Sequence, residues 1–320
     1  MNASLTHPTW PTHRFRAMGS QIQFWLDADS RLAQLAFTRA EAYVQAAERR
    51  LTRFDPDSEL SRLNAQPEEW VTVSPLLWDV ATQALHFAEA TAGDFDPTLL
   101  SAMHAVGYTH SFSCTTEMSP SFATGAAAPG RYHEVQLDPD RRAIWLPAGV
   151  GLDFGGIGKG YIATHALSLL SETGPALVDA GGDVIAGDAP MGFPGWPVSI
   201  AEGDSGDLCL WLVSQGVATS GKDFRRWFGA DGQLRHHIID PHTGLPSLSN
   251  LVTATVLAPT VVQAEVWAKV ALVNGRERGL ALLHTQQLSA ALTDEDGVLW
   301  LTPNFESYLS IWPTTPNALA

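Results

Sequence analysis

Residues 152–167 read LDFGGIGKGYIATHAL, and residues 176–186 read ALVDAGGDVIA. The first stretch gathers glycines around Lys159 and then takes the apolar spacing of a helix that begins near Gly158. The second has a strand pattern on each side of Gly181 and Gly182, which is typical of a tight hairpin. Glycine lets backbone N–H groups approach phosphate oxygens, and a helix N-terminus attracts anions. The two stretches therefore favour a backbone site for phosphate, with Lys159 as its cation.

Each stretch also has a plainer interpretation. The first could be a glycine-rich turn with an exposed lysine, and the second a hairpin turn without a ligand. The first is not a Walker A loop, because Asp153 stands where that loop has its first glycine. Gly160 also follows the lysine, where a Walker A loop has Ser or Thr. Spacing alone leaves the choice between these interpretations open.

Helix and strand patterns continue on both sides of these stretches without strict alternation, which favours the α+β class. The helix at 75–92 has Pro75 in its first turn and Gly93 just past its end. The composition of residues 111–130, rich in Ser, Thr, Ala, Pro and Gly, predicts a loop. The other predicted helices cover 31–51, a start near Gly158, 261–273 and 276–284, and the predicted strands cover 21–26, 134–138, 142–146, 176–186 with its turn, 197–201, 208–213, 217–220, 235–239, 252–257 and a hairpin at 289–301.

Composition restricts the classes of partner. The chain has 320 residues, of which 45% are hydrophobic and 17% charged, so it can bury a large core. The net charge of −15 argues against a nucleic-acid partner, because phosphate backbones require clustered Lys and Arg. No apolar run is long enough to cross a membrane, and the N-terminal residues lack a secretory pattern, so we expect a cytoplasmic protein. Cys114 and Cys209 show no metal-ligand spacing and are expected to be free thiols.

Two further segments carry groups that could do chemistry. His236 and His237 are adjacent in a strand pattern, so their side chains should point to opposite faces and at most one should face a given site. A histidine here could be a general base, oriented by Asp240, or a core residue with satisfied hydrogen bonds. Glu265 and Lys269 share one helical face, and their plainest interpretation is a surface ion pair.

Seven segments in order give the chain a resemblance to one family. They are Ala17–Ser20, Phe54–Glu59, Gly93–Thr98, Asp153–Tyr161, Ala180–Asp183, Thr219–Gly221 and His237–Gly244. Together they resemble the ApbE-type flavin transferases, also called FAD:protein FMN transferases, from about residue 15 to about residue 300. The resemblance implies an α+β fold of the ApbE-like, T-fold type, with mixed sheets and packed helices. It also implies Mg²⁺-dependent transfer of FMN from FAD to a threonine of a target flavoprotein, with release of AMP.

The resemblance assigns a role to particular residues of this chain. His237 takes the position of the base for the threonine hydroxyl. Gly158, through its carbonyl, and Glu265 and Lys269 take the positions around the metal. The FAD site implied by the resemblance contains Met18, Ser58, Glu59, Asn64, Asp96, Thr98, Lys159, Gly181, Gly182, Asp183, Ser220 and Asp240.

The chain departs from the family pattern at the implied metal site. Glu265 stands where the family has Asp, and Lys269 where it has Thr. Glutamate can still bind Mg²⁺, but an ammonium group only donates hydrogen bonds and repels the ion. Thr164 also replaces a common Asp. Lys269 is therefore a candidate substitute for the metal.

Three functions follow from this pattern. The first is an FMN transferase, with activity reduced by the altered metal site. The second is an FAD-binding protein with little or no transferase activity, and the third an FAD pyrophosphatase that uses water instead of threonine. We expect a flexible tail at 1–14, one FAD-binding domain at 15–305 and a C-terminal tail at 306–320.

Overall fold

The computed structural model describes residues 10–111, 128–203, 206–229, 232–305 and 308. Its centre is an eight-stranded sheet in the order β1-β2-β6-β7-β10-β15-β16-β17. Every neighbouring pair in this sheet is antiparallel. The strands are β1 (Thr12–Ala17), β2 (Ser20–Leu26), β6 (Ala176–Ala180), β7 (Asp183–Ala186), β10 (Gln215–Gly221), β15 (Leu251–Ala258), β16 (Ser289–Asp294) and β17 (Leu299–Leu301).

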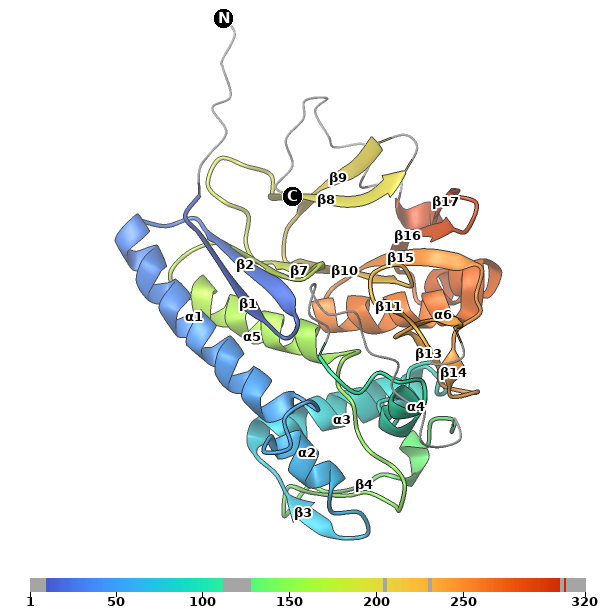
Figure 1. Ribbon diagram of the computed structural model, residues 1–320. Coiled ribbons are helices and arrows are strands. Elements are labelled where there is room, and N and C mark those ends of the chain that lie inside the picture. The colour runs from blue at the N-terminus through green and yellow to red at the C-terminus, as the bar shows by residue number, and fades with distance from the viewer. Residues whose placement is uncertain (1–9, 112–127, 204–205, 230–231, 306–307, 309–320) are drawn as a thin grey trace, which may run out of the picture.

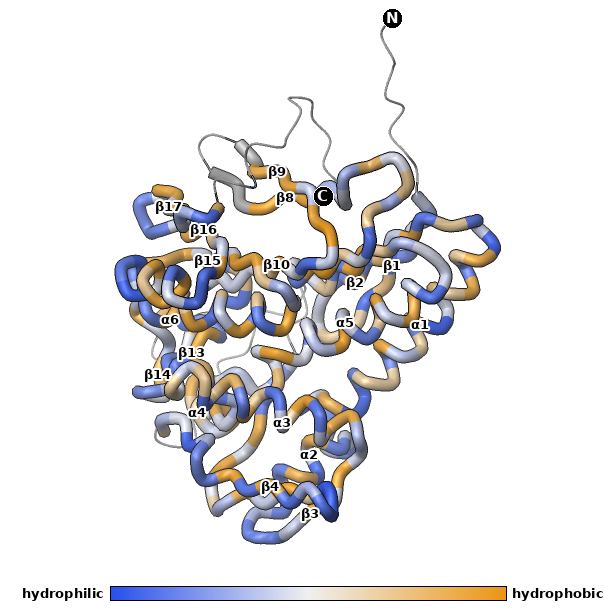
Figure 2. The backbone as a smooth tube through the Cα atoms, turned by 180° about the vertical axis from the view of Figure 1, so that it is seen from behind, coloured by the Kyte–Doolittle hydropathy of each residue, from blue (hydrophilic) through white to orange (hydrophobic). Residues whose placement is uncertain are grey.

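Three helices, α1 (Ser30–Leu51), α5 (Gly158–Ser171) and α6 (Val261–Thr285), cover one face of this sheet (Figure 1). The opposite face carries the hairpin of β8 (Trp196–Gly203) and β9 (Gly206–Leu212). Trp196 and Leu210 are fully buried in a second apolar cluster between this hairpin and the sheet. Figure 2 shows hydrophilic and hydrophobic residues interspersed along α1, as expected for a helix with one buried face. The α+β class is confirmed.

A second layer lies beyond the helices, on the side away from the sheet (Figure 1). It contains α2 (Glu59–Asn64), α3 (Pro75–Ala90), α4 (Leu100–Ala105) and the small sheet of β3 (Trp70–Thr72), β5 (Ala143–Trp145) and β4 (Gln136–Asp138). Short strand pairs near α6 complete the fold: β11 (Arg226–Phe228) with β12 (Leu234–His236), and β13 (Ile239–Asp240) with β14 (Leu245–Pro246). The 3₁₀ turns are Tyr132–Glu134 and Pro303–Phe305.

Local sequence explains where several helices begin and bend. Ser58 caps α2, since its hydroxyl accepts the Ser61 N–H, and Ser74 caps α3 in the same way before Pro75. α6 kinks at Gly275, whose φ of 76° is a conformation that glycine adopts readily. The two helices predicted at 261–273 and 276–284 are confirmed as the two helical segments of α6, which meet at the non-helical Gly275.

The chain ends differ from the predicted tails where the structure describes them. β1 begins at Thr12, inside the range 1–14 that was predicted to be flexible, and pairs with β2. Residues 1–9 lie outside the described residues, as do Cys114 with most of the loop predicted at 111–130, and most of 306–320. Within the described ranges no helix is both long and apolar enough to span a bilayer.

The start of α6 lies against the backbone of β10, so Gly216 should be essential for stability. A Cβ at Gly216 would lie 2.3 Å from Val261 N and 2.4 Å from Val261 Cα. We expect Gly216→Ala to lower the free energy of unfolding by about 1–3 kcal/mol or more, measured by urea denaturation. Gly158→Ala is the matched control for folding, because its Cβ would meet neighbours at 3.7 and 3.8 Å. Equal stability of the two variants would contradict this packing.

Candidate active site

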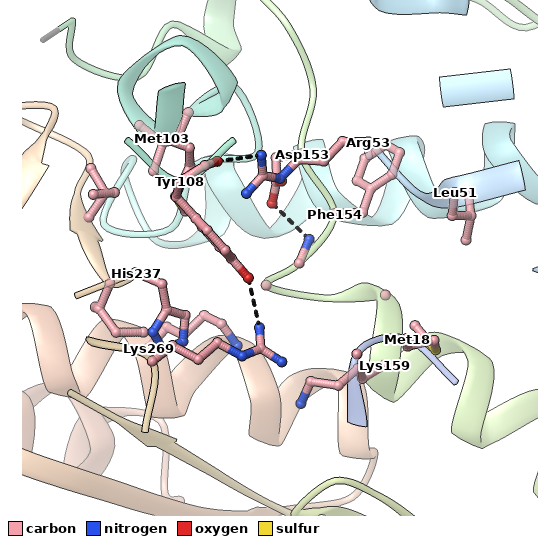
Figure 3. A pocket seen from close by; sticks show the side chains of 18 of the residues that line it. Met18, Leu51, Arg53, Met103, Tyr108, Asp153, Phe154, Lys159, His237 and Lys269 are labelled. Carbon is pink, nitrogen blue, oxygen red and sulfur yellow. Dashed lines mark hydrogen bonds and ion pairs between the residues drawn. The ribbon is translucent and has the colours of Figure 1, made fainter. Parts of the chain in front are cut away.

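A cavity of about 370 Å³ opens between the end of α1, the glycine-rich loop, α6 and the segment between β12 and β13. Its lining combines apolar side chains with a concentration of basic groups (Figure 3). Lys159 and Lys269 both line it, although the chain has only three lysines. Arg53, Arg225 and His237 line it as well. The carboxylates of Glu48, Asp94, Asp96 and Asp153 line the cavity as well, and the two lysines among them make it a candidate site for an anion.

The glycine-rich loop enters the cavity at the N-terminus of α5. Gly155, Gly156, Gly158 and Lys159 line the wall. A Cβ at Gly156 would lie 3.0 Å from Phe95 and 3.3 Å from the Lys269 side chain, so a small residue is required at that point. The loop is fixed by its neighbours, since Asp153 accepts a hydrogen bond from Gly155 N–H and pairs with Arg53 at 2.5 Å. A helix N-terminus and a lysine thus face one cavity, as the sequence predicts.

Lys159 is part of a buried cluster of opposite charges. Its ammonium pairs with Asp183, which is 1% exposed, and lies 3.8 Å from Glu265 Oε1. Burial opposes the charge on Lys159, but Asp183 and Glu265 outweigh it and raise the pKa of Lys159. Burial raises the pKa of Asp183, against the attraction of Lys159. Lys159 is therefore a permanent cation at the cavity wall.

Glu265 links the start of α5 to α6. Its Oε2 accepts the Gly160 N–H at 2.9 Å, and its Oε1 lies 3.3 Å from the Lys269 ammonium. Burial opposes ionisation of Glu265, yet Lys269, Lys159 and the Gly160 amide together lower its pKa. At 1% exposure this is not the surface ion pair of the plainest interpretation. It is a buried pair, with the lysine at the cavity.

His237 faces the cavity and its neighbour His236 does not. His236 Nε2 is bonded to the Ser247 carbonyl at 3.1 Å, and its Nδ1 accepts the Ile238 N–H. His237 lines the cavity, and its buried Nδ1 has no hydrogen-bond partner. Burial, followed by Arg225 and Lys269, lowers the pKa of His237 well below 6.5. The imidazole is therefore neutral at physiological pH, with a nitrogen directed at no protein group.

The Tyr108 side chain lies between His237 and Arg53 in the cavity (Figure 3). His237 lies on one side, with its ring centroid 6.4 Å from that of Tyr108. On the other side the Arg53 guanidinium lies 4.5 Å from the Tyr108 ring centroid. The Tyr108 hydroxyl accepts a hydrogen bond from Arg225 at 3.4 Å. Sequence reasoning missed Tyr108, Arg53 and Arg225; of these only Arg53 carried a signal, because it directly precedes the Phe54-Asp55-Pro56 segment.

The structure divides the residues predicted for the site into three groups. Met18, Asp96, Gly158, Lys159, His237 and Lys269 line the cavity. Asp183 and Glu265 do not line the cavity, but both contact Lys159, which does. The cavity lining does not include Ser58, Glu59, Asn64, Thr98, Gly181, Gly182, Ser220 or Asp240.

Several residues outside the lining hold the surrounding loops in place. Asn64 accepts the Leu152 N–H and donates to the Leu152 carbonyl, which fixes the chain just before the glycine-rich loop. Glu59 accepts the N–H and hydroxyl of Ser74 at the start of α3. Thr98 donates to Asp96, whose pKa is raised by burial. Asp240 accepts the His242 N–H in the turn after β13. Gly181 and Gly182, with φ of 70° and 92°, form the predicted turn between β6 and β7.

The donors around Glu265 do not fit Mg²⁺. Both Glu265 oxygens are engaged, by the Gly160 amide and by lysine ammonium groups, and Lys269 offers no lone pair. Thr164 bonds its own helix, donating to the Gly160 carbonyl at 2.8 Å. Among the described residues, no three His, Cys, Asp or Glu side chains are placed to hold a metal ion. Mg²⁺ prefers six oxygen ligands in octahedral geometry, which this mixture of ammonium and carboxylate groups does not supply.

Fold and cavity together define an α+β protein with a cation-lined ligand site and a neutral histidine at its wall. The model of the ApbE family matches residues 18–292. This chain belongs to the ApbE family.

Known proteins match most of the length of this chain. An FAD:protein FMN transferase from Klebsiella pneumoniae is 28% identical, over 96% of this chain and 93% of its own length. One from Treponema pallidum is 30% identical, over 75% and 71%. The ApbE protein of Thermotoga maritima superposes with a TM-score of 0.82 at 24% identity, over 94% of this chain and 99% of its own. The apo flavinyl transferase ApbE of Pseudomonas stutzeri gives 0.80 at 21%, over 95% and 98%, so the ApbE fold is confirmed.

Proposed function

We propose that this protein is an FAD:protein FMN transferase, which moves FMN from FAD to a threonine of a target flavoprotein and releases AMP. Family membership supports the reaction class. The observation that carries the proposal is a neutral His237 at the wall of a cavity that Lys159 and Lys269 also line. A site that only binds FAD would not require such a base.

In the proposed reaction the threonine hydroxyl oxygen attacks the phosphorus of the FMN half of FAD. A new oxygen–phosphorus bond forms, and the pyrophosphate bond breaks as AMP leaves with the bridging oxygen. An imidazole nitrogen of His237 accepts the proton of the threonine hydroxyl, which is otherwise a weak nucleophile. Lys159 and Lys269 offset the negative charge of the pyrophosphate. Phosphoryl transfer depends chiefly on such positioning and charge compensation.

FAD should bind more tightly than FMN. The cavity presents two ammonium groups and a helix N-terminus, which suit two linked phosphates better than one. We expect isothermal titration calorimetry to give a dissociation constant for FAD at least about 10-fold lower than for FMN, as one extra charge-assisted hydrogen bond would produce. Equal dissociation constants for FAD and FMN would show that this cavity does not bind the pyrophosphate.

The pH dependence should follow His237. Its neutral form is the base and dominates above its pKa, which lies well below 6.5 in the free protein. Lowering that pKa extends the active range towards acid, so kcat/KM should not fall by half until the pH is below 6.5. The profile of kcat/KM reports free-enzyme pKa values and is the quantity to measure. An acid limb centred at or above 6.5 that is absent from a His237 variant would contradict the assigned base.

We further propose that the protein acts in the cytoplasm. Cell fractionation with an antibody against the chain would check it.

A further inference from the structure

Lys269 is built into the anion site and is not an incidental surface residue. It lies on α6, and its side chain is 20% exposed where it reaches the cavity. The aliphatic part of its side chain packs against Gly156. A Cβ at Gly156 would lie 3.3 Å from Lys269 Cδ and Cε. The glycine-rich loop therefore leaves room for this side chain. Glu265 Oε1, 3.3 Å from its ammonium, fixes the charged end.

The charges around Lys269 leave no position for a divalent cation. Glu265 and Asp183 are the carboxylates that contact these two lysines, and Lys269 and Lys159 already counter them. A Mg²⁺ ion at Glu265 would have to displace the Lys269 ammonium, and the two cations would repel each other at that distance. Before a ligand enters, the cluster is balanced, and Arg225 at the cavity wall adds a further positive charge.

We propose that the Lys269 ammonium replaces the divalent cation of this site and, together with Lys159, pairs with the pyrophosphate of FAD. FAD then binds without Mg²⁺. Glu265 is a positioning residue, since one oxygen orients Lys269 and the other holds the Gly160 amide at the start of α5. This inference rests on the proposed function, because it concerns the ligand of the same cavity.

The first test is calorimetry of FAD binding to the wild-type protein, with excess MgCl₂ and with EDTA. We expect the same dissociation constant in both solutions. In EDTA, Lys269→Met should weaken FAD binding about 10- to 100-fold, the loss of one charge-assisted hydrogen bond. Lys269→Arg should retain most of the affinity. Lys222→Met is the matched control, because Lys222 is a buried lysine outside the cavity, bonded to the Ser249 carbonyl.

The second test restores oxygen ligands at the two positions. Glu265→Asp combined with Lys269→Thr offers a carboxylate and a hydroxyl, which Mg²⁺ and Mn²⁺ accept. We expect FAD binding to the double variant to require Mg²⁺, and Mn²⁺ titration followed by electron paramagnetic resonance to detect a bound ion only in that variant. Circular dichroism melting checks that each variant folds. If Lys269→Met does not fold, the wild-type comparison decides alone.

The two possible failures are distinguishable. The proposed role of Lys269 would be wrong if EDTA sharply lowered the affinity of the wild type for FAD, or if the wild type bound Mn²⁺. Either result would leave the assignment of the cavity as the FAD site unchanged. Absence of FAD binding in both solutions would overturn the proposed function and this inference with it.

Discussion

We expect His237→Ala to transfer FMN about 10²–10⁴-fold more slowly than the wild type, the usual contribution of a general base. Among the described residues His237 is the one histidine that lines the cavity, so alanine removes the imidazole placed there. The affinity for FAD should change little, since a neutral imidazole pairs weakly with a pyrophosphate. Single-turnover kinetics with saturating FAD and acceptor measure the rate, and calorimetry measures the affinity.

The neighbouring histidine provides the control for this variant. His236 bonds the Ser247 carbonyl and the Ile238 N–H and does not line the cavity. His236→Asn keeps a donor and an acceptor at that position and should transfer FMN at close to the wild-type rate. If His237→Ala is as active as the wild type, or if both variants are equally slow, His237 has no special role as the base.

Lys159→Met should have the second largest effect. It removes a cation that lines the cavity, and we expect kcat/KM for FAD to fall about 10²–10³-fold, as when one preorganised donor to a transition state is removed. Lys159→Arg keeps the positive charge and should recover part of the loss. Lys222→Met, which deletes the lysine outside the cavity, should leave kcat/KM unchanged.

Folding must be checked for Lys159→Met, because Asp183 and Glu265 would each lose a partner while only 1% exposed. Removing one member of a buried ion pair costs about 3–5 kcal/mol. Far-UV circular dichroism and a melting curve separate unfolding from a functional loss. A folded Lys159→Met variant with undiminished kcat/KM would exclude the lysine from the site.

Local patterns in the sequence predict most of the regular structure. The helix predicted from Gly158 and the hairpin around Gly181 and Gly182 are confirmed, because glycine and apolar spacing act over a few residues. β1 was missed, since its alternation of exposed and half-buried residues at an edge of the sheet gives little hydrophobic signal. The helices predicted at 261–273 and 276–284 are present on either side of Gly275, where the backbone leaves helical geometry.

The candidate site was only partly predictable, because it is assembled from segments distant in sequence. Lys159 and His237 stand in recognisable motifs, and both line the cavity. Tyr108 and Arg225 reach the same cavity from segments with no motif, through a contact between residues 117 apart. Ser58 lies in a motif yet caps α2, since a capping hydroxyl and a ligand-binding hydroxyl look alike in sequence.

The most direct test of the proposed function is to incubate the protein with FAD and an acceptor flavoprotein that carries the target threonine of an ApbE transferase, then identify every flavin product by mass spectrometry. We predict AMP in solution and FMN attached to the threonine, in equal amounts and dependent on His237. FAD recovered unchanged would indicate a binding protein, and free FMN without covalent flavin would indicate a pyrophosphatase; either result would contradict the transferase.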